Sequence, residues 1–476
     1  MKDPLLALSY DDVLLVPRFS SVRSRKDPCT ATQLTVHIKL EIPIVSANMD
    51  TVTESRMAIA LARLGGIGII HRFMSVEREV EEVLKVKRAE AFVIDDPYTV
   101  EPETLLTEAR ARMQHLGAAL LVVDRKHTLV GILTNRDIEF VRDGLLCVKD
   151  VMTTRLITAS RKISMSGAEE MFKLHKIEKL PLVDAKGKLV GLITKKDIVT
   201  RMRNPHAAKD NKGRLLVGAA VGVVGDYVAR TKALVDAGVD CIVIDIAHGH
   251  SIMMKEAIAK IKKITGHSVD IIAGNIATAE GVRDVVAWGA HAVKVGIGPG
   301  AACTTRIMTG VGVPQFSAVL QCAKMAKRLG IPVIADGGIK YSGDITKALA
   351  AGAESVMIGS MFAGTDESPG VEIVKNGARY KRYRGMASLG ANVDKNELLN
   401  PQQTTDYQSI TPEGVEATVP YKGSLGATVA PLMGGLRSGM SYLGAMTIKE
   451  MSQKGEYVRI TQAGIRESNS HDIDVK

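Results

Sequence analysis

Short apolar runs alternate with amphipathic stretches over residues 214–365, and this alternation restricts the possible folds more than any other feature of the chain. The runs are brief and rich in Val and Ile, as expected for buried strands. They lie at residues 215–217, 241–245, 271–273, 292–295, 332–335 and 355–358. The stretches between them, such as 227–237 and 318–329, have helical periodicity. Strict alternation of strand and helix predicts a parallel sheet covered by helices.

Nearly every predicted strand ends in a polar residue or a glycine. Asp245 ends one run, and Gly274 and Asn275 follow the next. Functional groups at the carboxyl ends of strands are typical of the active face of a (β/α)8 barrel. Runs at 43–46 and 66–70 supply further strands of the same kind. We therefore predict an α/β fold built on a TIM barrel. A Rossmann domain is the competing fold, but no GxGxxG motif opens a helix after the first strand.

An internal repeat interrupts the predicted barrel. The sequence VGILTNRDI at 130–138 recurs as VGLITKKDI at 190–198, and the segments before them also match. Each copy predicts helix, strand, turn, strand and helix. Two such copies resemble a tandem CBS pair, a module that commonly binds adenine or guanine nucleotides; a purely structural insert is the alternative. We expect this pair over 92–203, which leaves 1–91 and 204–476 to form the barrel.

A glycine-rich loop after the run at 292–295 presents a single thiol, Cys303. The loop reads GIGPGAACTTR from Gly296 to Arg306, and its three glycines permit tight turns with positive φ close to a ligand. A thiol at the end of a strand is suited to attack an electrophilic carbon. The alternative is a buried structural cysteine, because free cysteines often behave as small hydrophobic residues. The loop alone leaves both interpretations open.

Composition narrows the possible partners and compartment. The five cysteines are scattered without a CxxC motif, which indicates a reduced, cytoplasmic protein rather than a disulfide framework or a zinc site. We find no signal segment and no long apolar span, so we expect no membrane partner. The net charge of +10 suits anionic ligands such as phosphates. Because Lys and Arg are dispersed and aromatic residues make up only 4%, we expect no nucleic-acid partner.

Residues 386–424 lack the strand–helix alternation of the barrel. The stretch is polar and contains the motif Pro412-Glu-Gly414. A loop of this length within a domain is usually functional or disordered. We predict that 386–424 forms a catalytic flap.

Short motifs in a fixed order cover nearly the whole chain. They lie at 10–15, 48–52, 245–250, 273–275, 298–306, 335–338, 383–386, 412–414 and 434–439. Together they resemble the IMP dehydrogenase/GMP reductase family. The resemblance implies a TIM barrel, a homotetramer or octamer, and CBS domains like those of most dehydrogenases and some reductases. It also implies a covalent purine–cysteine adduct. Dehydrogenases oxidise IMP to XMP with NAD, whereas reductases convert GMP to IMP and ammonia with NADPH.

The resemblance implies three catalytic residues and a nucleotide site. Cys303 would be the nucleophile, Thr305 a proton carrier beside it, and Glu413 the acid/base of the flap. Asp336 would accept hydrogen bonds from the ribose hydroxyls. Glu413 as a solvated flap residue and Asp336 as a turn cap are the alternatives. The other residues expected against GMP or IMP are Ser46, Gly337, Gly338, Gly359, Ser360, Tyr383, Gly385 and Met386.

The resemblance also implies a cofactor side and a cation site. The residues expected to line the nicotinamide side are Asp245, Asn275, Gly296 and Gly298. The groups expected to bind a potassium ion are the carbonyls of Gly298, Gly300 and Cys303, together with Glu467 of the partner subunit. His248 and His250 are not expected to bind a metal, because no carboxylate or cysteine lies at ligand spacing around them.

The predicted flap favours one of the two reactions. Dehydrogenases carry an Arg-Tyr pair there that activates water, but here Asp406 precedes Tyr407 and no Arg occurs over 385–435. Asn48 is also reductase-like, whereas 247–251 resembles bacterial dehydrogenases. We therefore predict a CBS-containing GMP reductase that uses NADPH. IMP dehydrogenase with NAD is the alternative, and a nucleotide-sensing protein on an inactive barrel is a third hypothesis.

Overall fold

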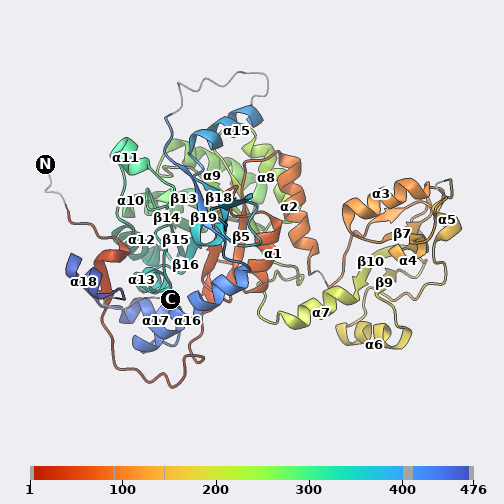
Figure 1. Ribbon diagram of the computed structural model, residues 1–476, viewed down its shortest axis with the longest axis horizontal. Coiled ribbons are helices and arrows are strands. Elements are labelled where there is room, and N and C mark those ends of the chain that lie inside the picture. Colours follow the sequence, from red (N-terminus) through yellow and green to blue (C-terminus); the bar gives the residue numbers. More distant parts are fainter. Residues whose placement is uncertain (1–4, 91, 144, 400–410, 471–476) are drawn as a thin grey trace. The chain divides into compact units, whose positions relative to one another are not determined.

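The computed structural model describes residues 5–90, 92–143, 145–399 and 411–470, which divide into two compact units (Figure 1). The first unit comprises the described residues of 1–87, 206–210 and 215–476. The second comprises those of 88–205 and 211–214, and the predicted limits of the insert, 92 and 203, fall inside it. Among the described residues, no helix is long and apolar enough to cross a membrane.

Eight parallel strands close into a barrel in the first unit, as predicted. Around the barrel they are β4 (Ile44–Ser46), β5 (Ile67–Ile70), β11 (Val217–Val221), β12 (Cys241–Asp245), β13 (Asp270–Ile276), β14 (Ala292–Val295), β15 (Val333–Asp336) and β16 (Ser355–Ile358). Parallel strands covered by helices are buried on both faces, which explains their continuous apolar character. Side chains such as Val243, Ile272 and Ile334 fill the interior.

Helices surround the barrel (Figure 1). Those that follow successive strands are α1 (Ser55–Arg63), α2 (Val76–Arg88), α8 (Tyr227–Asp236), α9 (Ile252–Thr265), α10 (Ala279–Trp288), α12 (Gln315–Leu329), α13 (Ser342–Ala350) and α16 (Leu425–Tyr442). The hydroxyls of Ser251 and Thr278 cap α9 and α10 by accepting backbone N–H groups. Helix α16 contacts both α13 and α1, so it closes the ring of helices.

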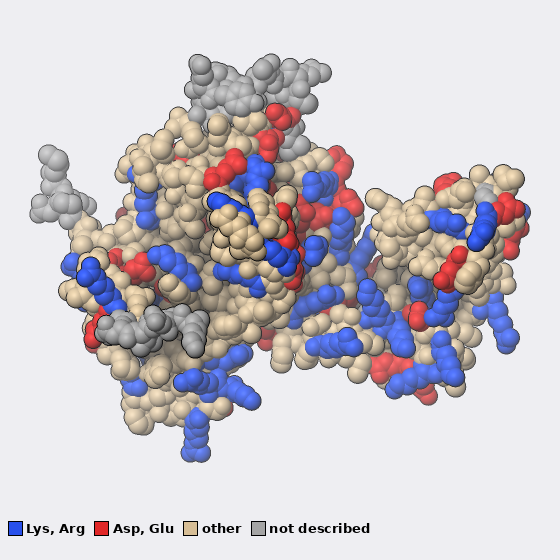
Figure 2. Space-filling view, in the orientation of Figure 1, with Lys and Arg blue, Asp and Glu red and all other residues tan. Residues whose placement is uncertain are grey.

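Smaller elements decorate the barrel. At the chain ends, β1 (Val13–Leu15) pairs with β20 (Tyr457–Arg459). The others are η1 (Tyr10–Asp12), β2 (Thr32–Gln33), β3 (Lys39–Leu40), α11 (Thr305–Thr309), α14 (Ser360–Ala363), α17 (Ile448–Lys454) and α18 (Gln462–Glu467). On the face seen in Figure 2, acidic and basic side chains are interspersed, in keeping with the dispersed charge of the sequence.

The predicted flap contains regular structure that the sequence did not indicate. Helix α15 (Leu389–Leu399) and strand β19 (Glu416–Pro420) lie within 386–424, although this stretch has no clear periodicity. Strand β19 pairs with β18 (Ala378–Arg384), which also pairs with β17 (Glu372–Lys375). Strand pairing and polar contacts therefore order these segments without an apolar face. Asp406 and Tyr407, which bear on the direction of the reaction, lie outside the described residues.

The second unit is built from two similar halves. The first contains β6 (Thr99–Val100), α3 (Leu106–Leu116), β7 (Leu120–Val123), β8 (Leu129–Leu133), α4 (Asn135–Ile138) and α5 (Val148–Val151). The second contains α6 (Met165–His175), β9 (Lys179–Val183), β10 (Leu189–Thr194) and α7 (Lys195–Arg203). Both halves have the predicted order helix, strand, strand, helix. Each has its own apolar cluster, and a third cluster that includes Leu121 and Leu192 joins them. The assignment of the second unit as a CBS pair stays a prediction.

A buried lysine near the end of α2 joins three segments of the first unit. Lys87 Nζ lies 2.6 Å from Asp240 Oδ2, 3.2 Å from Asp210 Oδ2 and 3.0 Å from the Leu215 carbonyl oxygen. The Lys87 side chain is only 3% exposed. Removing one partner of such a buried ion pair leaves an uncompensated charge in a poorly solvated position.

We expect Lys87→Met to lower the free energy of unfolding of the barrel by about 3–5 kcal/mol. Urea denaturation followed by circular dichroism measures this change. Lys340→Met is the matched control, because Lys340 pairs with Asp11 at 2.7 Å but is 61% exposed. That control should cost less than about 1 kcal/mol. Equal losses in the two variants would show that the buried network does not stabilise the barrel.

Candidate active site

The loop between β14 and α11 presents Cys303 beside Thr305. The Cys303 thiol donates a hydrogen bond to the Thr305 hydroxyl, with 3.2 Å between Sγ and Oγ1. Gly298, earlier in the loop, has a φ of +86°, a conformation that glycine adopts without steric cost. The structure thus brings together the two residues that were predicted as nucleophile and proton carrier.

The loops after β14 and β15 approach each other so closely that side chains would not fit between them. A Cβ atom at Gly296 would lie 2.1 Å from the carbonyl oxygen of Asp336. A Cβ atom at Gly337 would lie 2.9 Å from Pro299 Cγ and 3.2 Å from the Gly300 nitrogen. Two glycines therefore allow the cysteine loop to pack against the loop that carries Asp336.

The residues of the flap just before β19 pair with the cysteine loop. Gly414 forms an antiparallel bridge with Cys303. The Thr304 N–H donates to the Glu413 carbonyl at 2.8 Å, and the Val415 N–H donates to the Ala302 carbonyl at 3.0 Å. The Gly385 N–H in turn donates to the Val415 carbonyl at 3.0 Å. The backbone of Glu413 therefore lies next to that of the thiol loop, although the two are far apart in sequence.

A lysine that was not predicted as a site residue lies among three that were. Lys294, in β14, is 2% exposed, and its Nζ lies 2.8 Å from Asp245 Oδ1 and 2.7 Å from Asp336 Oδ2. It also donates to Asn275 Oδ1. Asn275 Nδ2 donates to Asp336 Oδ2 at 2.9 Å and to the Gly296 carbonyl at 2.6 Å. The available signal was a charged residue inside an otherwise apolar run, Ala292-Val-Lys-Val295.

The charges around Lys294 stabilise one another. Burial alone would lower the pKa of the Lys294 ammonium, but the carboxylates of Asp245 and Asp336 outweigh it and raise that pKa. Burial likewise favours a higher pKa for Asp245, yet the Lys294 ammonium brings it below its usual value. Near neutral pH, the Lys294–Asp245 pair is therefore ionised.

Other residues that were predicted to bind GMP or IMP lie at or near the ends of further strands. Gly359 follows β16 directly, and a Cβ atom there would lie 3.5 Å from the Tyr383 hydroxyl. Tyr383 is buried, and this burial, reinforced by the nearby Asp336 and Cys303, raises the pKa of its phenol to about 12. The phenol is therefore a neutral hydrogen-bond donor at physiological pH. Ser46 ends β4, and its hydroxyl accepts from Thr53 Oγ1 at 2.8 Å.

The residues considered as metal ligands lie in the cysteine loop, on α18 and after β12. The carbonyls of Gly298, Gly300 and Cys303 belong to one tight loop, and carbonyl oxygens are suitable ligands for a potassium ion. Glu467 is exposed on α18, and its predicted role depends on the partner subunit. His250 pairs with Asp284, with 2.9 Å between Nε2 and Oδ2. Among the described residues, no group of three or more His, Cys, Asp and Glu side chains could hold a metal ion.

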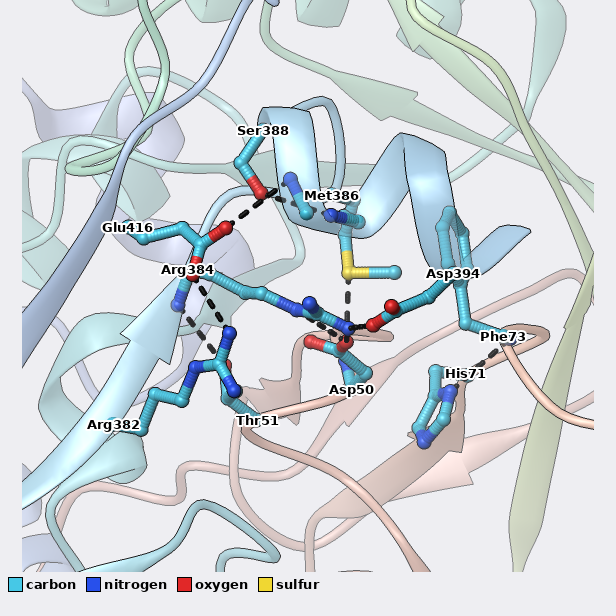
Figure 3. Close-up of polar contacts among 12 residues, drawn as sticks. Asp50, Thr51, His71, Phe73, Arg382, Arg384, Met386, Ser388, Asp394 and Glu416 are labelled. Carbon is cyan, nitrogen blue, oxygen red and sulfur yellow. Dashed lines mark hydrogen bonds and ion pairs between the residues drawn. The ribbon is translucent and has the colours of Figure 1, made fainter. Parts of the chain in front are cut away.

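Ion pairs anchor the start of the flap, as Figure 3 shows. The Arg384 guanidinium, at the end of β18, lies between Asp50 and Asp394 of α15. Arg384 Nε donates to Asp50 Oδ2 at 2.7 Å, and Nη2 donates to Asp394 Oδ2 at 2.5 Å. The Asp50 N–H also contacts Met386 Sδ at 3.4 Å. Arg384 and Asp50 were not selected from the sequence, but they fix the loop that contains the predicted ligands Gly385 and Met386.

Comparison with known proteins places this arrangement in a family. The sequence matches the IMP dehydrogenase/GMP reductase domain over residues 7–471. It is 53% identical to inosine-5′-monophosphate dehydrogenase of Aquifex aeolicus over 472 residues, which cover 98% of this chain and 96% of the relative.

Solved structures of a GMP reductase are also similar. The structure of GMP reductase from Trypanosoma brucei with a cysteine-to-alanine substitution, in complex with guanosine 5′-monophosphate, has a TM-score of 0.92 and 44% identity, and the match covers 99% of both chains. The complex of the same enzyme with guanosine 5′-triphosphate has a TM-score of 0.81 and 40% identity, over 96% of this chain and 99% of that one.

The barrel and these similarities define an oxidoreductase of the (β/α)8 class that acts in purine metabolism. The chain belongs to the IMP dehydrogenase/GMP reductase family.

The flap anchor gives a prediction about stability. We expect Asp50→Ala to lower the free energy of unfolding by about 3 kcal/mol, because Arg384 and Asp50 are 9% and 10% exposed and the variant leaves a buried guanidinium with less compensation. Asp394→Ala is the matched control and should cost less than about 1 kcal/mol, since Asp394 is 55% exposed. Chemical denaturation of both variants measures the difference. A loss at Asp394 as large as that at Asp50 would contradict the burial argument.

Proposed function

We propose that this protein is a GMP reductase, which converts GMP to IMP and ammonia with NADPH as the reductant. The observation that carries the proposal is the absence of arginine from residues 385–435. Dehydrogenases of this family use an Arg-Tyr pair in the flap to activate the water that hydrolyses their adduct. A reductase has no use for that pair, because water attack would divert its intermediate.

The alternative function is IMP dehydrogenase, with NAD as the oxidant. Relatives such as that of Aquifex aeolicus, at 53% identity, bear that name. A GMP reductase structure is similar over 99% of both chains, at 44% identity, so the similarities by themselves fit either function. Under the dehydrogenase hypothesis, Asp406, Tyr407 or a nearby lysine has to activate water in place of an arginine.

The proposed chemistry begins with the Cys303 thiolate, which attacks C2 of the GMP purine. Thr305, within hydrogen-bonding distance of the thiol at 3.2 Å, relays a proton. Glu413 supplies the proton with which the C2 amine leaves as ammonia. A reduced nicotinamide held beside Asp245 and Asn275 would supply the hydride that C2 accepts. The C2–S bond then breaks to release IMP and the thiolate. The fixed pairing of Gly414 with Cys303 supports this assignment, because it keeps the flap backbone beside the adduct.

The other site residues are proposed to bind the ligands. Asp336 accepts from the ribose hydroxyls. Gly338, Gly359, Ser360 and the neutral Tyr383 phenol hold the 5′-phosphate. Asp245 and Asn275 face the nicotinamide. The carbonyls of the cysteine loop suit potassium, which would stabilise the turn that presents the thiol.

Regulation and assembly complete the proposal. The second unit, as a CBS pair, would bind an adenine or guanine nucleotide. We further propose a cytoplasmic homotetramer or octamer, in which Glu467 of the partner subunit completes the cation site. Mass photometry tests the assembly, and calorimetric titration with GTP or ATP tests nucleotide binding.

We expect purified protein mixed with GMP and NADPH to lose absorbance of the reduced nicotinamide and to release one ammonia per NADPH consumed. A coupled ammonia assay measures the stoichiometry, and omission of GMP is the control. Turnover of IMP and NAD to XMP with no reaction of GMP would make the protein an IMP dehydrogenase. Nucleotide binding without either reaction would favour a sensor on an inactive barrel.

We expect Cys303→Ala to abolish turnover, by at least about 1000-fold, while GMP still binds with a Kd within about tenfold of the unsubstituted protein. The reason is that the thiol forms the adduct but contributes few contacts to the ground state. Calorimetric titration measures binding, and Cys322→Ala, at a buried cysteine away from the loop, is the control. Loss of GMP binding in Cys303→Ala alone would show that the thiol is structural.

A further inference from the structure

A buried ammonium lies between the two halves of the proposed site. Lys294 Nζ contacts Asp336, which is assigned to the ribose, and Asp245 and Asn275, which are assigned to the nicotinamide side. We propose that Lys294 is a positioning residue, which holds the Asp336 carboxylate in the orientation that selects ribonucleotides over 2′-deoxyribonucleotides. This inference rests on the proposed function of Asp336 and goes beyond it, because it assigns the selectivity to a residue that need not touch the nucleotide.

The hydrogen bonds to Asp336 hold only one side of its carboxylate. Lys294 Nζ and Asn275 Nδ2 both donate to Oδ2, at 2.7 and 2.9 Å. Among the described residues, we find no donor to Oδ1, and the side chain of Asp336 is 21% exposed whereas that of Lys294 is 2% exposed. A carboxylate held through one oxygen can offer the other to a ligand hydroxyl without turning. The two bonds therefore define which side of Asp336 faces a nucleotide.

Charge explains why a lysine is needed between these carboxylates. Asp245 and Asp336 both approach the same ammonium to within 3 Å, and their side chains are 24% and 21% exposed. Without the ammonium, the two carboxylates would repel each other. Arg72 also lowers the pKa of Asp245, so Asp336 is the carboxylate that would take up a proton or turn away. A protonated or rotated Asp336 would accept fewer hydrogen bonds from the two adjacent ribose hydroxyls. Asn275 alone does not replace this effect, because an amide is neutral.

The backbone of Asp336 is fixed independently of Lys294. Gln315 Nε2 donates to the Asp336 carbonyl at 3.0 Å and to the Val295 carbonyl at 2.8 Å. Strand β15 is paired on both sides, with β14 and β16. The close approach of Gly296 to the Asp336 carbonyl adds a further contact that involves no lysine atom. Loss of the ammonium should therefore change the carboxylate and leave the strand in place.

The test is the selectivity for GMP over 2′-deoxy-GMP, measured as the ratio of their dissociation constants by calorimetry, so that it does not depend on turnover. We expect the unsubstituted protein to prefer GMP by about 10- to 100-fold, as for a hydrogen bond to a charged group. Lys294→Met should reduce the preference to within about threefold, mainly by weakening GMP. Asp336→Asn should do the same, and the double variant should lose little more, because the residues act together.

A merely structural role gives a different result. If Lys294 only supports the fold, Lys294→Met weakens GMP and 2′-deoxy-GMP equally and the ratio is kept, which overturns the inference. If Lys294→Met does not fold, Lys294→Met/Asp245→Asn relieves the excess negative charge, and retention of the preference there also overturns it. Failure of the unsubstituted protein to bind either GMP or IMP would refute the proposed function itself. Binding without any ribose preference would refute only the inference about Lys294.

Discussion

Closure of the parallel barrel is the constraint on which the rest of the site depends. All eight strands run in one direction, so their carboxyl ends meet at one rim. Asp245, Asn275 and Asp336 come from three strands, yet one ammonium joins them. The site is therefore assembled by strand pairing, and Gly296 lets the cysteine loop reach the same rim.

The flap is ordered by polar contacts more than by an apolar core. Arg384 joins it to Asp50, and backbone hydrogen bonds join Glu413 and Val415 to the cysteine loop. Such contacts are broken and reformed at lower cost than the packing of a barrel strand.

The two reactions of the family differ in what must reach the adduct. A dehydrogenase needs an activated water at the purine, and a reductase needs a proton for the leaving amine. The barrel residues serve either reaction, which explains why dehydrogenase sequences and reductase structures both match this chain closely. The flap residues decide between them, and the lack of a guanidinium in this segment is the chemical difference on which our assignment rests.

The sequence by itself indicated most of the barrel strands, the helices between them and the cysteine loop, because periodicity and glycine placement are local properties. The run at 215–217 was placed too early, since β11 spans Val217–Val221. The sequence also indicated Cys303, Thr305 and Asp336 through motifs shared with a family. It did not indicate α15, which has no apolar face, or the roles of Lys294 and Arg384, which look like ordinary charges in the sequence. Only the tertiary structure decided those, because the burial of a charge and the identity of its partners depend on which strand ends the closed barrel brings together.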